Sequence, residues 1–269
     1  MTVPSAGPDP YRHVEHVMGT VVSIDIRDRD LPPAGAAGAI AEVVAWLHHV
    51  DATYSPYRPD SIVSRLVHGG THLDDLDPDV RAVLAAAQTW TTRSGGTFTL
   101  HPDGHLDPSG FVKGWAVERA AGLLTAAGSR AHSVNGGGDI QTVGHAGEGR
   151  PWRLGITHPH RPGALAAVVE GFDLAVATSG TAERGPHIID PRTGRPATAL
   201  ASITVTGTRL SDVDAAATAA FVHGPDAPSW LATQPGLAAL AITSTGEAWS
   251  TPGFPHAQTT PSNPTSGGR

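Results

Sequence analysis

The segment SDVDAAATAAFVHG, residues 211–224, holds the most informative pattern in this chain of 269 residues. Its alanine-rich composition predicts a helix over about 211–222 that ends at Gly224. Asp214 and Thr218 are one helical turn apart and therefore share one face of that helix. Because their neighbours are mostly alanine, we expect this face to pack closely, and a carboxylate and a hydroxyl placed there need a polar partner.

Two interpretations of this pair are open. A hard divalent cation with oxygen ligands is a natural partner for Asp214 and Thr218. In the alternative, Asp212 caps the helix, Asp214 stabilises its first turn, and Thr218 bonds back to a backbone carbonyl. Taken alone, the motif favours this second, structural interpretation.

The rest of the chain mixes strands and helices. Val22, Ile24 and Ile26 alternate with polar residues, which predicts a half-buried strand over 20–27. Helices are predicted over 36–50, from a cap at Asp77 to Gly95, and over 113–127, and strands at 152–156, 166–170, 174–177, 202–206 and 237–243. The mixture predicts an α+β fold, with one domain over 13–250 between a flexible N-terminus (1–12) and a disordered tail (251–269) rich in Pro, Thr, Ser and Gly.

Composition excludes several classes of protein. The chain contains no cysteine, which rules out disulfides, thiolate metal centres and a cysteine nucleophile. Its net charge is -7 and it has no Lys/Arg cluster, which argues against a nucleic-acid binder. Since no apolar run could span a membrane and no signal-peptide pattern is seen, we expect a cytoplasmic protein without membrane insertion.

The segment LDPSGFVKGWA, residues 106–116, places an acid, a turn of small residues, a lysine and a helix start close together. Helix N-termini attract phosphate, and Lys113 can add positive charge there. Asp107 could bind an amide or hydroxyl of a ligand, and the Gly110 carbonyl could face a metal. A Pro/Gly turn with an ordinary helix cap explains the pattern equally well.

Two further segments are rich in turns. In SVNGGGDI, residues 133–140, three glycines let the backbone pass close to a flat or bulky group, although a hairpin turn is the simpler interpretation. In the segment 175–196, Thr178 and Ser179 offer hydroxyls, and His187 is a candidate general base. Most histidines have no such role. Met18 and Tyr57 could sandwich an aromatic ring system, although such residues more often pack in the core.

In this order, these segments resemble the ApbE family, the FAD:protein FMN transferases. The matching motifs run from Met18 to about Thr243 and are MGT, YRPDSIVSRL, SGG-x-F, LD-x-x-G-x-x-KG-x-A-x-x-x-A, VNGGGDI, ATSG, HIIDPRTGRP and D-x-x-x-T. The resemblance implies antiparallel sheets packed with helices, of the tunnelling-fold kind. It also implies magnesium-dependent transfer of FMN from FAD to a Thr/Ser hydroxyl of an acceptor flavoprotein, with release of AMP.

The resemblance further implies roles for individual residues. Asp214 and Thr218, with the Gly110 carbonyl and Ala217, match the family's Mg²⁺ ligands, and His187 matches the histidine that assists the attacking hydroxyl. The positions that match contacts to FAD are Met18, Tyr57, Thr97, Phe98, Thr99, Asp107, Lys113 and Ile188. Thr97 and Thr99 depart from the family pattern, in which Ala and Asp are usual. An FAD pyrophosphatase that yields FMN and AMP, and a non-catalytic FAD-binding protein, remain as alternatives.

Overall fold

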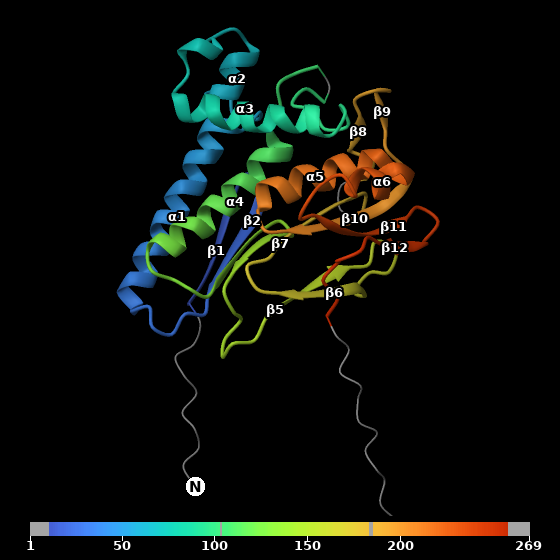
Figure 1. Ribbon diagram of the computed structural model, residues 1–269. Coiled ribbons are helices and arrows are strands. Elements are labelled where there is room, and N and C mark those ends of the chain that lie inside the picture. Colours follow the sequence, from blue (N-terminus) through green and yellow to red (C-terminus); the bar gives the residue numbers. More distant parts are fainter. Residues whose placement is uncertain (1–10, 103, 183–184, 258–269) are drawn as a thin grey trace, which may run out of the picture.

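The computed structural model describes residues 11–102, 104–182 and 185–257. An eight-stranded sheet in the order β1-β2-β3-β4-β7-β10-β11-β12 forms its centre (Figure 1). Every neighbouring pair in this sheet is antiparallel. The strands are β1 (Tyr11–Val17), β2 (Thr20–Ile26), β3 (His132–Gly136), β4 (Asp139–Val143), β7 (Ala175–Gly180), β10 (Leu200–Gly207), β11 (Ala238–Thr243) and β12 (Ala248–Ser250).

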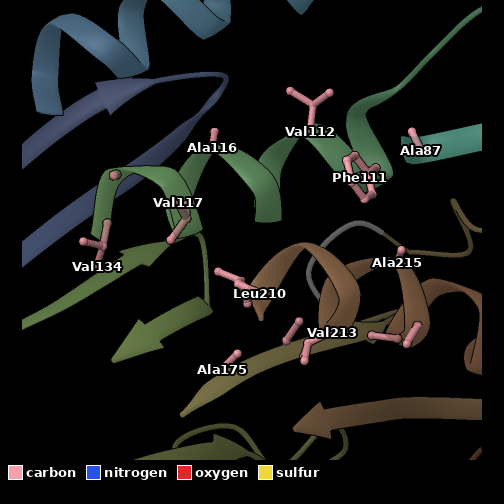
Figure 2. Close-up of a cluster of buried hydrophobic side chains, with 14 of the residues drawn as sticks. Ala87, Phe111, Val112, Ala116, Val117, Val134, Ala175, Leu210, Val213 and Ala215 are labelled. Carbon is pink, nitrogen blue, oxygen red and sulfur yellow. The ribbon is translucent and has the colours of Figure 1, made fainter. Parts of the chain in front are cut away.

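Helices cover one face of this sheet. Helix α4 (Ser109–Ala126) packs on β3 and β4, α5 (Leu210–His223) packs on β7 and β10, and α1 (Pro33–Tyr54) packs against α4 and β1. Figure 2 shows the apolar contacts in this layer, with Val117 of α4, Leu210 and Val213 of α5, and Val134 of β3. The other helices of the described residues are α2 (Ile62–Val67), η1 (Leu73–Asp75), α3 (Pro78–Arg93), η2 (Gly224–Asp226) and α6 (Ala227–Leu231).

A hairpin covers part of the opposite face. It consists of β5 (Trp152–Thr157) and β6 (Leu165–Gly171), and it buries Ile156 and Val169 against Val176 of β7 and Phe254. The central strand β10 is buried along nearly its whole length, as expected for a strand covered on both sides. A third, two-stranded sheet pairs β8 (Ile189–Asp190) with β9 (Arg195–Pro196).

The predicted mixture of helices and antiparallel strands is confirmed, and most element positions agree with it. Asp77 caps α3 as predicted, since its side chain accepts a hydrogen bond from the Asp79 N–H. At the helix starts, one prediction and one part of the alternative interpretation are wrong. Helix α4 begins at Ser109, so Lys113 lies in its second turn rather than at its first residue. The N-cap of α5 is Arg209, and Asp212 lies inside the helix, 3.6 Å from Arg93 Nη1.

The sequence pattern also missed the first strand. Tyr11 and Arg12, expected in a flexible terminus, begin β1, whose inward positions include His13 and Glu15. Because polar residues occupy both faces of this edge strand, no apolar alternation marks it. Of the segment predicted to be a tail, the structure describes 251–257, in which Phe254 is buried and His256 forms a bridge with Val169. Residues 1–10 and 258–269 lie outside the described residues.

No helix within the described ranges combines the length and apolar character that crossing a membrane requires.

Candidate functional site

Helices α4 and α5 touch at Gly114. Its N–H donates to Asp214 Oδ2 over 3.0 Å. A Cβ atom at this position would lie 2.7 Å from both Asp214 Cβ and the Leu210 carbonyl oxygen, which is closer than real Cβ atoms approach. Glycine is therefore what lets α5 bring Asp214 against the backbone of α4.

The neighbouring residue of α4 places a positive charge between two acids. Lys113 Nζ forms an ion pair with Asp139 Oδ2 and lies 3.6 Å from Asp214 Oδ1. Asp139 is the first residue of β4 and directly follows a two-glycine turn, Gly137–Gly138, in which both φ angles are positive. The glycine run thus forms the hairpin turn that the simpler interpretation predicted, and it also delivers a carboxylate to Lys113.

Both carboxylates of this charge cluster, which we define as Lys113, Asp139 and Asp214, are buried. The exposed fractions of the side chains are 3% for Asp139, 7% for Asp214 and 33% for Lys113. Burial raises the pKa of Asp214, while the Lys113 ammonium and the Gly114 N–H act in the opposite direction. With both acids ionised, the cluster has one more negative than positive charge, and an additional cation would relieve the cost of burying that excess.

Hydroxyl groups extend the cluster along α5 and β7. Thr218 lies one turn beyond Asp214, and its Oγ1 is 3.5 Å from Ser179 Oγ. The groups here that could bind a metal ion, two carboxylates and two hydroxyls, all present oxygen atoms, which fits a hard cation such as Mg²⁺. Among the described residues, no group of three His, Asp or Glu side chains could hold a metal ion by itself. A cation here would therefore also need hydroxyl, carbonyl, water or substrate oxygens.

The two remaining predicted metal ligands lie on the same helices. Gly110 is the second residue of α4, and a Cβ added there would come within 3.2 Å of the Phe98 ring. Ala217 is buried in α5 beside Thr218. A role for their backbone atoms in metal binding stays a prediction.

Met18 is positioned next to the glycine run. It forms the β1–β2 turn with Gly19, and its φ of 54° is unusual for a residue with a side chain. The two hairpin turns meet, because the Gly137 N–H donates to the Val21 carbonyl over 3.1 Å. The MGT and GGGD motifs therefore lie at the same end of the sheet, and the positive φ at Met18 is what a two-residue hairpin turn of this kind requires.

The residues that precede α4 form a compact turn. Thr97 and Phe98 are buried, and Thr97 Oγ1 donates to the Ser94 carbonyl over 3.0 Å. The Thr99 hydroxyl accepts from the His101 N–H at 3.1 Å, and Asp107 Oδ1 accepts from the Ser109 N–H at 2.9 Å. The Thr97 hydroxyl thus has a hydrogen-bond partner within the turn. Asp107 precedes Pro108, the N-cap of the helix that contains Lys113.

Three predicted residues are not joined to the charge cluster. Tyr57 is 90% exposed on the segment that follows α1. His187 is exposed, and its Nδ1 lies 3.0 Å from the Gly185 carbonyl, while Ile188 packs on the main core. Within the described part of the chain, no hydrogen bond or ion pair connects His187 or Tyr57 with Lys113, Asp139 or Asp214. Residues 183–184, near His187, lie outside that part.

Asp139 is the residue that the sequence analysis missed. Its signal was an acid directly after three glycines, at the start of a strand that proves to be internal to the sheet. A carboxylate in that place is costly to bury and therefore requires a partner. The partner is Lys113, which is 26 positions away in the chain.

These features define an α+β protein with a buried, oxygen-rich charge cluster where two helices meet a sheet, and comparison with known proteins gives its family. The profile of the ApbE family matches residues 18–101 and 99–241, so the chain belongs to this family. It is 35% identical over 227 residues to an FAD:protein FMN transferase of Rhodobacter capsulatus, covering 81% of this chain and 40% of that protein. It is 33% identical over 199 residues to an FAD:protein FMN transferase of Klebsiella pneumoniae, covering 66% of this chain and 57% of that one. The chain thus spans about half the length of these two relatives.

Solved structures support the fold. An ApbE protein from Thermotoga maritima superposes with a TM-score of 0.79 at 20% identity, covering 91% of this chain and 97% of that one. A flavin transferase ApbE from Vibrio cholerae gives a TM-score of 0.78 at 23% identity, covering 91% and 98%. The similarity extends over nearly the whole of both solved chains.

Proposed function

We propose that this protein is an FAD:protein FMN transferase that moves FMN from FAD to a Thr or Ser hydroxyl of an acceptor flavoprotein and releases AMP. The observation that carries the proposal is the charge cluster Lys113–Asp139–Asp214, built from three of the motifs by which the chain resembles its family. The names of the relatives from Rhodobacter capsulatus and Klebsiella pneumoniae support the same reaction.

The metal site in this proposal uses residues of α4 and α5. Asp214 and Thr218 would hold Mg²⁺ through side-chain oxygens, with the Gly110 carbonyl and Ala217 completing the set. When bound, the cation would supply positive charge that stabilises the phosphate of the leaving AMP. Lys113 would add charge to the same region, because its ammonium is the partly exposed member of an otherwise buried cluster.

FAD would be oriented by residues from three parts of the chain. Met18 lies at the β1–β2 turn, beside the turn that carries Asp139. Thr99 and Asp107 belong to the segment that precedes α4, in which Thr97 and Phe98 are buried. Tyr57 and Ile188 would complete the pocket, and the large exposed area of Tyr57 leaves it free to cover a ring system.

Bond making and breaking in the transfer step are balanced. The acceptor hydroxyl oxygen attacks the phosphorus of the FMN half, and the bond from that phosphorus to the bridging pyrophosphate oxygen breaks. The electron pair of this bond leaves with AMP. His187 would accept the hydroxyl proton, and its local geometry suits this role. A carbonyl can only accept a hydrogen bond, so Nδ1 must carry the hydrogen that faces Gly185, which leaves Nε2 free to take a proton.

The decisive experiment mixes the purified protein, FAD and Mg²⁺ with a flavoprotein fragment that contains a candidate acceptor threonine. Flavin fluorescence in a denaturing gel and intact mass report the adduct, with EDTA and Asp214→Ala as controls. We expect a magnesium-dependent mass gain of one FMN phosphoester that both controls abolish. Release of FMN and AMP with several such fragments present and no adduct would favour the pyrophosphatase, and intact FAD throughout would favour a binding protein.

A further inference from the structure

Asp139 has no counterpart among the metal and flavin positions considered above, yet its side chain is more buried than that of any other member of the charge cluster. Both of its carboxylate oxygens are occupied. Oδ1 accepts from the Thr178 N–H over 3.1 Å, and Oδ2 pairs with Lys113. Because one contact comes from the neighbouring strand β7, the carboxylate is held by the sheet and is a fixed anchor for the lysine.

Asp214 is differently arranged. Its Oδ2 is taken by the Gly114 N–H, while Oδ1 lies 3.6 Å from Lys113 Nζ. Oδ1 is thus the less engaged of the two oxygens and the one better placed to bind a metal ion, and it is also the oxygen nearest the lysine. An ammonium that moved fully onto Oδ1 would compete with a divalent cation for the same atom.

We propose that Asp139 is a positioning residue that retains the Lys113 ammonium and thereby keeps Asp214 Oδ1 open to a divalent cation. The inference rests on the proposed metal site. It divides the charges in a definite way, with the lysine assigned to the acid on β4 and the metal ion assigned to the acid on α5. Without the charge on Asp139, the lysine pairs with the one remaining buried carboxylate and blocks it.

The test measures metal binding without FAD or acceptor. Metal-free protein is titrated with Mn²⁺, and free Mn²⁺ is followed by electron paramagnetic resonance, with Mg²⁺ as competitor. Asp139→Asn removes the charge but keeps an oxygen for the Thr178 N–H. We expect it to weaken Mn²⁺ binding about tenfold, in the range seen when the partner of a metal ligand is removed.

A matched control is Asp212→Asn. Asp212 lies on α5, the helix of Asp214, but it pairs with Arg93 outside the charge cluster. We expect this substitution to change Mn²⁺ affinity by less than about twofold, because Asp212 is already paired with Arg93 and both side chains are partly exposed to screening solvent and salt. The melting temperature of each variant shows whether the fold is kept. Equal Mn²⁺ affinity of Asp139→Asn and wild type would overturn the proposal.

A double-mutant cycle separates positioning from a direct effect of the Asp139 charge. In a Lys113→Met background there is no ammonium to release, so Asp139→Asn should cause no further loss of Mn²⁺ affinity. If the loss persists there, Asp139 acts on the metal by itself and the inference is wrong. If Lys113→Met does not fold, a crystal structure of Asp139→Asn decides. Lys113 paired with Asp214 Oδ1 would support positioning, and Lys113 elsewhere would overturn it.

The same titration separates this inference from the proposed function. A wild-type protein that binds no Mn²⁺ would overturn both, because the metal site itself would be absent. A wild-type protein that binds Mn²⁺, with Asp139→Asn binding equally well, would overturn only the positioning role.

Discussion

The charge cluster and the segment that carries His187 differ in how firmly the fold holds them. The cluster is fixed by contacts from α4, α5, β4 and β7, and its two acids are nearly inaccessible to solvent. His187 is exposed, and among the described residues its ring has a hydrogen-bond contact only with the nearby Gly185 carbonyl. In the proposed reaction the buried region would stabilise charge, and the exposed segment would meet the protein acceptor, which must arrive from solution.

The largest expected effect is on the exposed segment, at His187. His187→Ala should slow FMN transfer by about 10²–10⁴-fold, the usual contribution of a general base. The free energy of unfolding should change by less than about 0.5 kcal/mol, because an exposed side chain contributes little to stability. Initial transfer rates and urea denaturation measure the two quantities. Transfer at the wild-type rate would remove His187 from the mechanism.

The second prediction concerns the charge cluster and tests the contact between α4 and α5 at Gly114. Gly114→Ala forces a Cβ atom to within 2.7 Å of Asp214 and Leu210, so α5 must move away from α4. We expect a loss of about 3 kcal/mol in the free energy of unfolding, typical of overpacking in a core. Urea denaturation measures it, and Mn²⁺ affinity should fall as well.

Gly122 provides the matched control for this substitution. It lies in the same helix, and a Cβ atom added there meets nothing within 4 Å. Gly122→Ala should therefore raise the free energy of unfolding by up to about 1 kcal/mol, as expected from helix propensity. Equal destabilisation by the two alanines would show that the close approach of α4 and α5 is not what requires Gly114.

The third prediction concerns the pH dependence of stability at a buried histidine. His132 is fully buried between Ser129 and the Ala121 carbonyl, and burial lowers its pKa to about 4. In the unfolded chain its pKa returns to about 6.5, so between these values the unfolded state binds more protons. The contribution of His132 to the free energy of unfolding is therefore fully present above about pH 6.5. It is lost as the pH falls toward 4, and the loss is at most about 3 kcal/mol.

Urea denaturation of wild type and His132→Gln between pH 7 and 4 measures this contribution, as the difference between the two pH profiles. We expect the variant to lose less stability than wild type on acidification, because the buried imidazole that must take up a proton is gone. A His132→Gln profile parallel to that of wild type would contradict the assignment.

Local patterns in the chain predicted much of the framework. The Asp77 cap, the strand over 20–27 and the one-turn spacing of Asp214 and Thr218 each depend on residues close in sequence, and the structure contains them. The β1 strand escaped prediction because an edge strand with polar residues on both faces has no apolar period. The start of α4 was placed too late, because Pro108 and Gly110 were interpreted as a turn preceding the helix.

The sequence by itself determined the α+β class and the helix face that presents Asp214 and Thr218, since these follow from short-range periodicity. Its motifs carried the resemblance to the family. Only the tertiary structure decided that Lys113 stands between Asp139 and Asp214, and that Gly114 is the point where two helices touch. Those contacts join residues 26 and 100 positions apart. They depend on how the helices pack on the sheet, and this packing is set by the whole core rather than by any local segment.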